Sequence, residues 1–150
     1  MKNHNSNEYI YKTTVTIGDT NIFQNMYFVN FFKIQGEVRE LWVRDCVEGY
    51  RESLQGNLIL VTYRASFQFL RDFFLFDNLV VKMQFTLIRR ASTDILFHFY
   101  KDSCSNIYAE GRQTIVFLDR SQNFIKIPEN FKKAIIKYSA ENNDFASSHL

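Results

Sequence analysis

The chain has 150 residues, of which 17% are aromatic, and a formal net charge of +2. This length is enough for one domain with its own core, and so small a charge excludes the broad basic surface that nucleic acid binding needs. No apolar run approaches the roughly 18 to 20 residues that span a bilayer, so we expect no membrane segment and no membrane partner.

The two cysteines, Cys46 and Cys104, fall in different predicted elements and match no metal-binding spacing. We therefore expect free thiols, a cytoplasmic protein, and neither a metal nor a cofactor. Residues 1–8 and 140–150 are polar and aperiodic, and the first of these ranges does not resemble a targeting signal. They are predicted to be flexible tails on either side of a single domain, 9–139.

Polarity alternates from Tyr9 to Ile17, which predicts a first strand with one buried face. Helical spacing follows over 26–47, with the apolar stripe Phe31, Ile34, Val38, Leu41, Trp42 and Cys46. Asn25 is the predicted N-cap of this helix, because its side-chain oxygen can accept a first-turn N–H. Gly36 costs about 1 kcal/mol in a helix interior and indicates close approach by the sheet or a partner.

Strand periodicity dominates the rest of the chain. It predicts strands over Ile59–Phe69, Leu79–Leu87, Ile95–Phe99, Ile107–Asp119 and Phe124–Ile127. Pro128 opens a final helix, Glu129–Ser139. The predicted fold is α+β, with an antiparallel sheet of five to six strands wrapped around one long central helix and a short C-terminal helix.

The polar turn 18–30 runs directly into the long helix, and this junction is the predicted active site. A helix N-terminus presents unpaired backbone N–H groups and the positive end of the helix dipole. Both stabilise an oxygen that becomes negative during a reaction.

Several blocks of sequence resemble one known family. They are 19–21, 25–30, 35–41, 67–77 and 109–113, which read DTN, NMYFVN, QGEVREL, FQFLRDFFLFD and AEGRQ. In this order they resemble the hot-dog-fold thioesterases of the 4-hydroxybenzoyl-CoA thioesterase-like group, above all those associated with enediyne polyketide synthases. The resemblance implies a hot-dog fold and an acyl-thioester substrate.

The resemblance also implies site residues. Asn21 occupies a position that is usually an aspartate in the broader group, and an amide can orient or hydrogen-bond but cannot act as a base. Arg39 matches the arginine that acts with it, and the backbone N–H groups of Met26, Tyr27 and Phe28 would form the oxyanion hole. The residues alone leave two other interpretations open. Asn21 is a common turn residue, and Arg39 can form a weak surface ion pair.

The segment 71–77 connects two predicted strands yet is rich in apolar residues, so it should cover something. By resemblance it closes a dimer and an acyl tunnel, and we expect a homodimer that pairs into a dimer of dimers. The residues expected to line the substrate are Asn25, Phe31, Phe69, Phe73 and Phe74. Basic residues that could contact phosphopantetheine or an acidic carrier are Lys12, Lys33, Lys82, Arg89 and Arg90.

The predicted function is hydrolysis of a polyketide or fatty acyl thioester of acyl carrier protein or coenzyme A, with water as the nucleophile and a polyketide synthase as a further partner. Two alternatives stay open. A non-catalytic acyl-thioester binder would also carry Asn at position 21. A hot-dog dehydratase or hydratase is disfavoured, because residues 19–30 hold no histidine. His98, the one histidine inside a predicted element, is expected to be structural.

Overall fold

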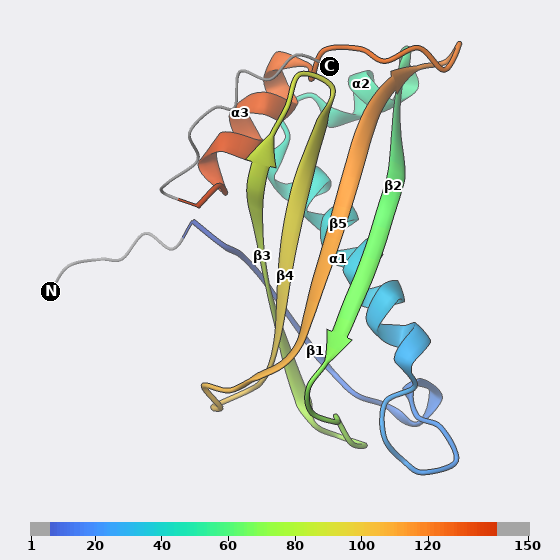
Figure 1. The fold of residues 1–150 in the computed structure, drawn as a ribbon, viewed down its shortest axis with the longest axis vertical. Helices are drawn as coiled ribbons and strands as arrows, with labels where there is room; N and C mark the ends of the chain where they lie inside the picture. Colours follow the sequence, from blue (N-terminus) through green and yellow to red (C-terminus); the bar gives the residue numbers. More distant parts are fainter. Residues whose placement is uncertain (1–6, 141–150) are drawn as a thin grey trace, which may run out of the picture.

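The computed structural model describes residues 7–140, so the predicted tails lie almost wholly outside the described residues. Its elements follow the order β1 (Tyr9–Thr14), α1 (Phe28–Cys46), α2 (Tyr50–Gln55), β2 (Leu58–Phe69), β3 (Asn78–Ile88), β4 (Ser92–Lys101), β5 (Ile107–Asp119) and α3 (Glu129–Lys137). Figure 1 shows a tall curved sheet with α1 running along it. No helix among these residues has both the length and the apolar character to cross a membrane.

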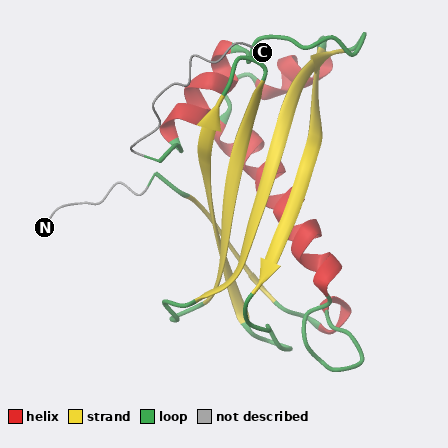
Figure 2. Ribbon diagram, in the orientation of Figure 1, coloured by secondary structure: helices red, strands yellow, loops and turns green. Residues whose placement is uncertain are grey.

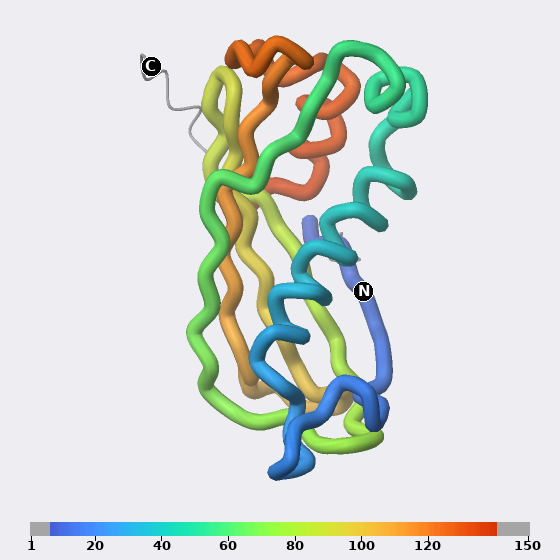
Figure 3. Tube along the Cα trace, turned by 90° about the vertical axis from the view of Figure 1, so that its right-hand side faces the viewer, coloured from blue at the N-terminus to red at the C-terminus, as the bar shows by residue number. Residues whose placement is uncertain are grey.

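The five strands form one antiparallel sheet in the order β1-β3-β4-β5-β2. Figure 2 separates the strands from the helices, and Figure 3, turned by 90°, shows α1 lying against one face of the sheet. This is the hot-dog arrangement that the sequence predicts. The edges of the sheet are β1 and β2, so each leaves one side of its backbone without a strand neighbour.

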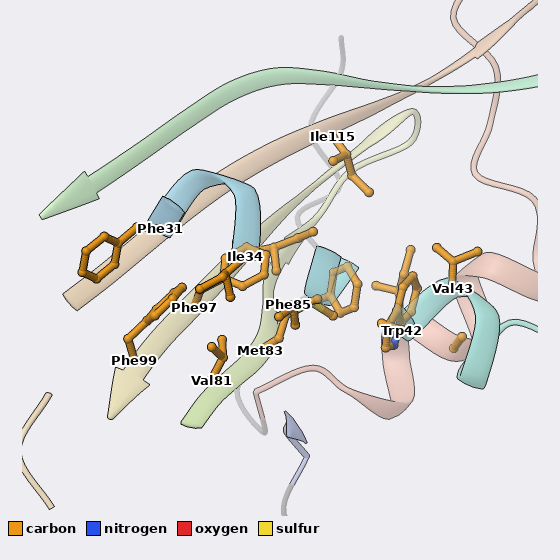
Figure 4. Packing of buried hydrophobic residues seen from close by; sticks show 14 of the residues in the cluster. Phe31, Ile34, Trp42, Val43, Val81, Met83, Phe85, Phe97, Phe99 and Ile115 are labelled. Carbon is orange, nitrogen blue, oxygen red and sulfur yellow. The ribbon is translucent and has the colours of Figure 1, made fainter. Parts of the chain in front are cut away.

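Alternation along the central strands explains the core. In β3 the residues Leu79, Val81, Met83 and Phe85 are fully buried, and the apolar residues of α1 pack against this face. Figure 4 shows Val81, Met83 and Phe85 of the sheet facing Ile34 and Trp42 of α1. On α1, the Trp42 ring packs against the Phe85 ring with the centroids 4.7 Å apart and the planes tilted by 57°.

Two local predictions were wrong, and one short helix was missed. The first strand ends at Thr14, because Ile17–Asp19 forms a 3₁₀ turn in which the Asp19 carboxylate accepts hydrogen bonds from the backbone and hydroxyl of Thr16. The sixth strand, Phe124–Ile127, does not form, since Phe124 makes only an isolated bridge to Leu118. The short helix α2 was not predicted, because it has too few residues to show periodicity.

Candidate active site

Asn21 lies in a loop that folds back on itself before α1. Thr20 pairs with Met26 across the loop, and the Asn21 N–H donates to the Asn25 carbonyl at 3.0 Å. The side-chain oxygen of Asn21 accepts the Phe23 N–H at 2.8 Å. The turn interpretation of Asn21 therefore holds for its oxygen, while its Nδ2 donors make no hydrogen bond with the described residues.

The start of α1 offers fewer of the expected donors than the sequence suggested. The Met26 N–H donates to the Phe73 carbonyl at 2.7 Å, and the Tyr27 N–H donates to the Asp19 carbonyl at 2.8 Å. These two groups are occupied, so only the Phe28 N–H remains of the predicted set. The Val29 N–H, which the sequence analysis missed, is equally without a partner among the described residues.

Asn25 is not the N-cap of α1, which corrects the prediction. The cap is Tyr27, with φ −63° and ψ 132°, and it makes no side-chain capping bond. Asn25 instead bridges to Phe74 in the segment between β2 and β3. Its side-chain oxygen is buried and accepts no hydrogen bond from the described residues.

An aromatic wall flanks the start of α1. The Phe28 ring meets Phe69 at 6.4 Å, Phe31 meets Phe69 at 5.0 Å, and Phe67 stacks on Phe69 at 5.7 Å. Of the predicted substrate-lining residues, Phe31 and Phe73 are buried in the core, whereas Phe69 and Phe74 are about half exposed. The exposed rings of this wall are therefore Phe28 and Phe69. Phe74 is also exposed, on the segment that pairs with Asn25 just before α1.

Arg39 lies about three turns further along α1 than Phe28, which is roughly 16 Å at the helical rise. One chain by itself therefore does not bring Arg39 to Asn21. The guanidinium Nη1 donates to the Thr62 hydroxyl of β2 at 2.6 Å and to the Gln113 side-chain oxygen of β5 at 3.0 Å. Burial lowers the pKa of Arg39 below its ordinary value, while the nearby Glu40 carboxylate opposes this shift.

Two buried amides hold Arg39 in this place, and the sequence analysis did not single them out. Gln113 donates to the Gln35 side-chain oxygen at 3.3 Å, and Gln35 donates to the Arg112 carbonyl at 3.2 Å. Gln35 is 1% exposed and Gln113 is 5% exposed. A glutamine on the apolar stripe of a helix and another on the buried face of a strand are the signals that could have revealed them.

Gly36 faces open space, which corrects the expectation that the sheet approaches it. A Cβ placed on Gly36 would meet nothing within 4 Å. Gly36 lies on the same side of α1 as Phe32 and Arg39, four residues after one and three before the other. Nothing among residues 7–140 explains a glycine at this position.

The remaining polar candidates lie away from the helix start. His98 pairs with Glu110 at 3.1 Å across β4 and β5, which agrees with a structural histidine, and this hydrogen bond pulls the pKa of Glu110 below its usual value. Of the five basic residues, three pair with carboxylates, namely Lys33 with Glu37, Lys82 with Glu8 and Arg89 with Asp94. Cys46 and Cys104 are free thiols, as predicted.

Two shallow clefts, of about 300 and 530 Å³, lie on the opposite side of the sheet. They are lined by residues of β1, β3 and the turn after β4, among them Lys12 and Lys82. Neither includes Asn21 or Arg39. The helix start therefore remains the place where unpaired donors and exposed aromatic rings come together.

The sequence matches the family model of the thioesterase-like superfamily over residues 15–135. The five-stranded antiparallel sheet with the long helix α1 against it is the fold of a hot-dog protein. The chain belongs to the thioesterase-like superfamily. No curated protein matches the sequence significantly.

Solved structures repeat the fold over nearly the whole chain. A dynemicin thioesterase, whose crystal structures reveal induced-fit and allosteric effects upon polyene binding, is 25% identical, with a TM-score of 0.83 over 89% of this chain and 98% of that one. A 1,4-dihydroxy-2-naphthoyl-CoA thioesterase from Synechocystis is 18% identical, with a TM-score of 0.79 over 86% and 96%. A gentisyl-coenzyme A thioesterase is 18% identical, with a TM-score of 0.74 over 85% and 99%.

Proposed function

We propose that this protein hydrolyses acyl thioesters at the start of α1. Water adds to the thioester carbonyl, the C–S bond breaks, and the departing thiolate takes the proton that the water loses. The observation that carries the proposal is the pair of unoccupied N–H groups of Phe28 and Val29, next to a loop in which Asn21 keeps its amide donors free.

The reaction puts negative charge on the carbonyl oxygen, and these donors suit that charge. The N–H groups of Phe28 and Val29 lie at the positive end of a 19-residue helix. The Asn21 amide adds a side-chain donor. Asp19, the carboxylate closest in sequence, accepts both Thr16 hydrogen bonds at its Oδ2. Catalysis then rests on positioning and on stabilising the oxyanion.

The substrate we propose has an apolar acyl chain, carried by coenzyme A or by an acyl carrier protein. Phe28, Phe69 and Phe74 expose about half of their surface beside the donors, and such a surface favours a long apolar or conjugated chain. The dynemicin thioesterase, 25% identical, is described for polyene binding. A polyketide acyl chain delivered by a synthase is therefore the first substrate to test.

We propose a homodimer, paired further into a dimer of dimers, in the cytoplasm. The unpaired edge of β2 is the surface that a second copy would cover. The two free cysteines fit a reducing compartment.

The backbone donors can be tested by placing proline at the first residue of α1. Phe28→Pro removes one N–H that no described group uses, and proline is well tolerated at this helix position. Tyr27 already has the extended conformation that a following proline requires. Phe28→Ala is the matched control, because it loses the same ring but keeps the N–H.

We expect Phe28→Pro to hydrolyse acyl-CoA and acyl-carrier-protein thioesters about 10²- to 10³-fold more slowly than Phe28→Ala at equal thermal stability. Thiol release from a panel of acyl chains is the measurement. Equal rates for the two variants would show that the Phe28 N–H does not stabilise the oxyanion. A wild-type protein that binds acyl chains and never releases thiol would be a binding module instead.

A further inference from the structure

The positive charge of the protein is concentrated near its C-terminus. Residues 120–139 hold five basic residues and one acidic residue. Residues 7–119 hold twelve basic and thirteen acidic residues, so that much longer part of the chain is almost neutral. The small net charge of +2 therefore conceals one strongly basic region.

The solvent side of α3 carries most of this charge. The apolar residues of the helix face the core, and three lysines occupy its other side, namely Lys132, Lys133 and Lys137. None of these lysines forms an ion pair with a described residue. The only acidic residue of the helix is Glu129, in its first turn. The three ammonium groups are therefore available to an anionic partner.

Two further basic residues adjoin this side of α3. Lys126 lies 3.9 Å from the Glu129 carboxylate, and both side chains are exposed, so this ion pair is weak. The Ile127 N–H donates to the Arg90 carbonyl at 2.9 Å, which holds the turn between β3 and β4 beside the segment before α3. Arg90 is itself exposed. We call the five residues Arg90, Lys126, Lys132, Lys133 and Lys137 the basic surface.

Exposed apolar side chains accompany the basic surface. Ile136 lies among the lysines of α3 and is 44% exposed, and Phe124, two residues before Lys126, is 69% exposed. Apolar side chains flanked by lysines are typical of helices that lie on a membrane. There the apolar groups enter the boundary between headgroups and acyl chains, while the long lysine side chains keep their charges at the phosphates.

We infer that the basic surface binds the surface of an anionic lipid bilayer. The lipid phosphates supply the complementary negative charge, and Ile136 and Phe124 enter the headgroup layer. This binding requires no segment that crosses a bilayer. The lack of a long apolar run, on which the expectation of no membrane partner rested, therefore does not oppose it.

The size of the basic surface favours lipid over an acidic protein. The exposed side of α3, with its nine residues, is about 14 Å long and 10 Å wide. A stable protein complex buries roughly 800 Å² on each partner, which is several times this area. The two clefts described above lie on the outer side of the sheet, so neither offers a pocket at α3 for an anchoring side chain of a partner. Attraction to a charged lipid surface needs neither a large area nor a pocket.

The position of the basic surface keeps the candidate active site away from the lipid. Figure 1 shows α3 and the turn between β3 and β4 at one end of the sheet, and the loop that leads into α1 at the other end. A molecule that lies on a membrane through α3 therefore leaves the start of α1 open to the solution. The inference does not depend on the proposed thioesterase function.

Vesicle flotation with the full chain tests the inference. Vesicles with equal amounts of phosphatidylcholine and phosphatidylglycerol should carry the protein with them, and vesicles of phosphatidylcholine alone should not. Salt at about 0.5 M should release the protein, because it screens the attraction. Equal flotation with both vesicles, or with neither, would overturn the inference. Binding to poly-L-glutamate without binding to the anionic vesicles would also overturn it and identify an acidic polypeptide as the partner.

A triple variant locates the binding on α3. Lys132→Gln, Lys133→Gln and Lys137→Gln together should lower the partition coefficient about 10²-fold, because each lysine near an anionic surface contributes about fivefold. The matched control is the triple variant Lys12→Gln, Lys33→Gln and Arg71→Gln, which removes the same charge at exposed positions elsewhere and should bind nearly as the wild type. Thermal unfolding checks that both variants are folded. An equal loss in the two variants would mean that net charge, and not this surface, binds the lipid.

Discussion

The side-chain oxygen of Asn21 accepts the Phe23 N–H at 2.8 Å, whereas the amide nitrogen donates to none of the described residues. Asn21→Asp keeps an oxygen for the turn and removes the N–H donors. We expect this variant to unfold at nearly the wild-type temperature but to hydrolyse thioesters about 10²-fold more slowly. Steady-state kinetics measure the hydrolysis rate, and thermal unfolding measures the unfolding temperature. If the aspartate variant is as fast as the wild type or faster, position 21 acts as an acceptor or base.

Gly36→Ala separates the stability of the chain from that of the dimer. Within one chain the new methyl group meets nothing, and alanine favours the helix by about 1 kcal/mol. In the homodimer proposed above, a partner that approaches Gly36 as closely as the mid-helix glycine indicates would meet this methyl group, so we expect association about tenfold weaker. Sedimentation over a dilution series measures the association. Gly18→Ala, at another glycine with open surroundings, is the control, and an unchanged dimer affinity in Gly36→Ala would contradict the close approach.

Gly111 is required for a reason internal to the chain. A Cβ at this position would lie 2.7 Å from the Phe67 ring and 3.0 Å from the Gln35 amide nitrogen. We expect Gly111→Ala to lower the free energy of unfolding by about 1 to 3 kcal/mol, because a rigid ring and a buried amide must both shift. Urea unfolding measures the loss. Adding Phe67→Leu should recover part of it, and strictly additive effects of the two substitutions would show that the ring is not the obstacle.

Asp94 makes the stability of the fold depend on pH. Burial alone would raise its pKa, but hydrogen bonds from Arg89 and Thr114 outweigh burial and hold the pKa below its usual value. The carboxylate therefore stabilises the fold above its unfolded pKa of about 3.9, and this contribution is lost as the pH falls through the lower folded value.

Asp94→Asn should accordingly lower the free energy of unfolding by about 1 kcal/mol at pH 7. The difference from the wild type should stay constant down to about pH 5 and shrink below about pH 4. Chemical unfolding at a series of pH values measures it, with the exposed Asp72→Asn as the control. A difference that persists unchanged at pH 3 would mean that the Asp94 charge is not the cause.

Much of the fold follows from local pattern. The apolar alternation in β3 and the helical stripe of α1 depend on residues close in sequence, and both elements formed where they were predicted, although α1 begins at Phe28, two residues after the predicted start. The cap was mistaken at Asn25 because capping preference is a property of the residue. What places Asn25 is a backbone bridge to Phe74, almost fifty positions away.

The site was harder to predict from the sequence, because contacts between residues far apart in the chain decide its geometry. That the N–H groups of Met26 and Tyr27 are occupied depends on the carbonyls of Phe73 and Asp19, which no local pattern places. The neighbours of Arg39 belong to β2 and β5, and no spacing in α1 predicts them. The separation of Arg39 from Asn21, by contrast, follows from the rise of the helix per residue, so it could have been calculated from the sequence.

Trp42 gives the molecule a built-in optical probe. It is the only tryptophan of the chain, it is fully buried, and its indole N–H has no acceptor among the described residues. An indole in so apolar a setting emits at short wavelength, and the emission moves to the red when water reaches it. Because Trp42 packs against Phe85 far from the helix start, ligand titrations should leave this fluorescence nearly unchanged while denaturant shifts it. Fluorescence of the unlabelled protein can thus report folding separately from occupancy of the site.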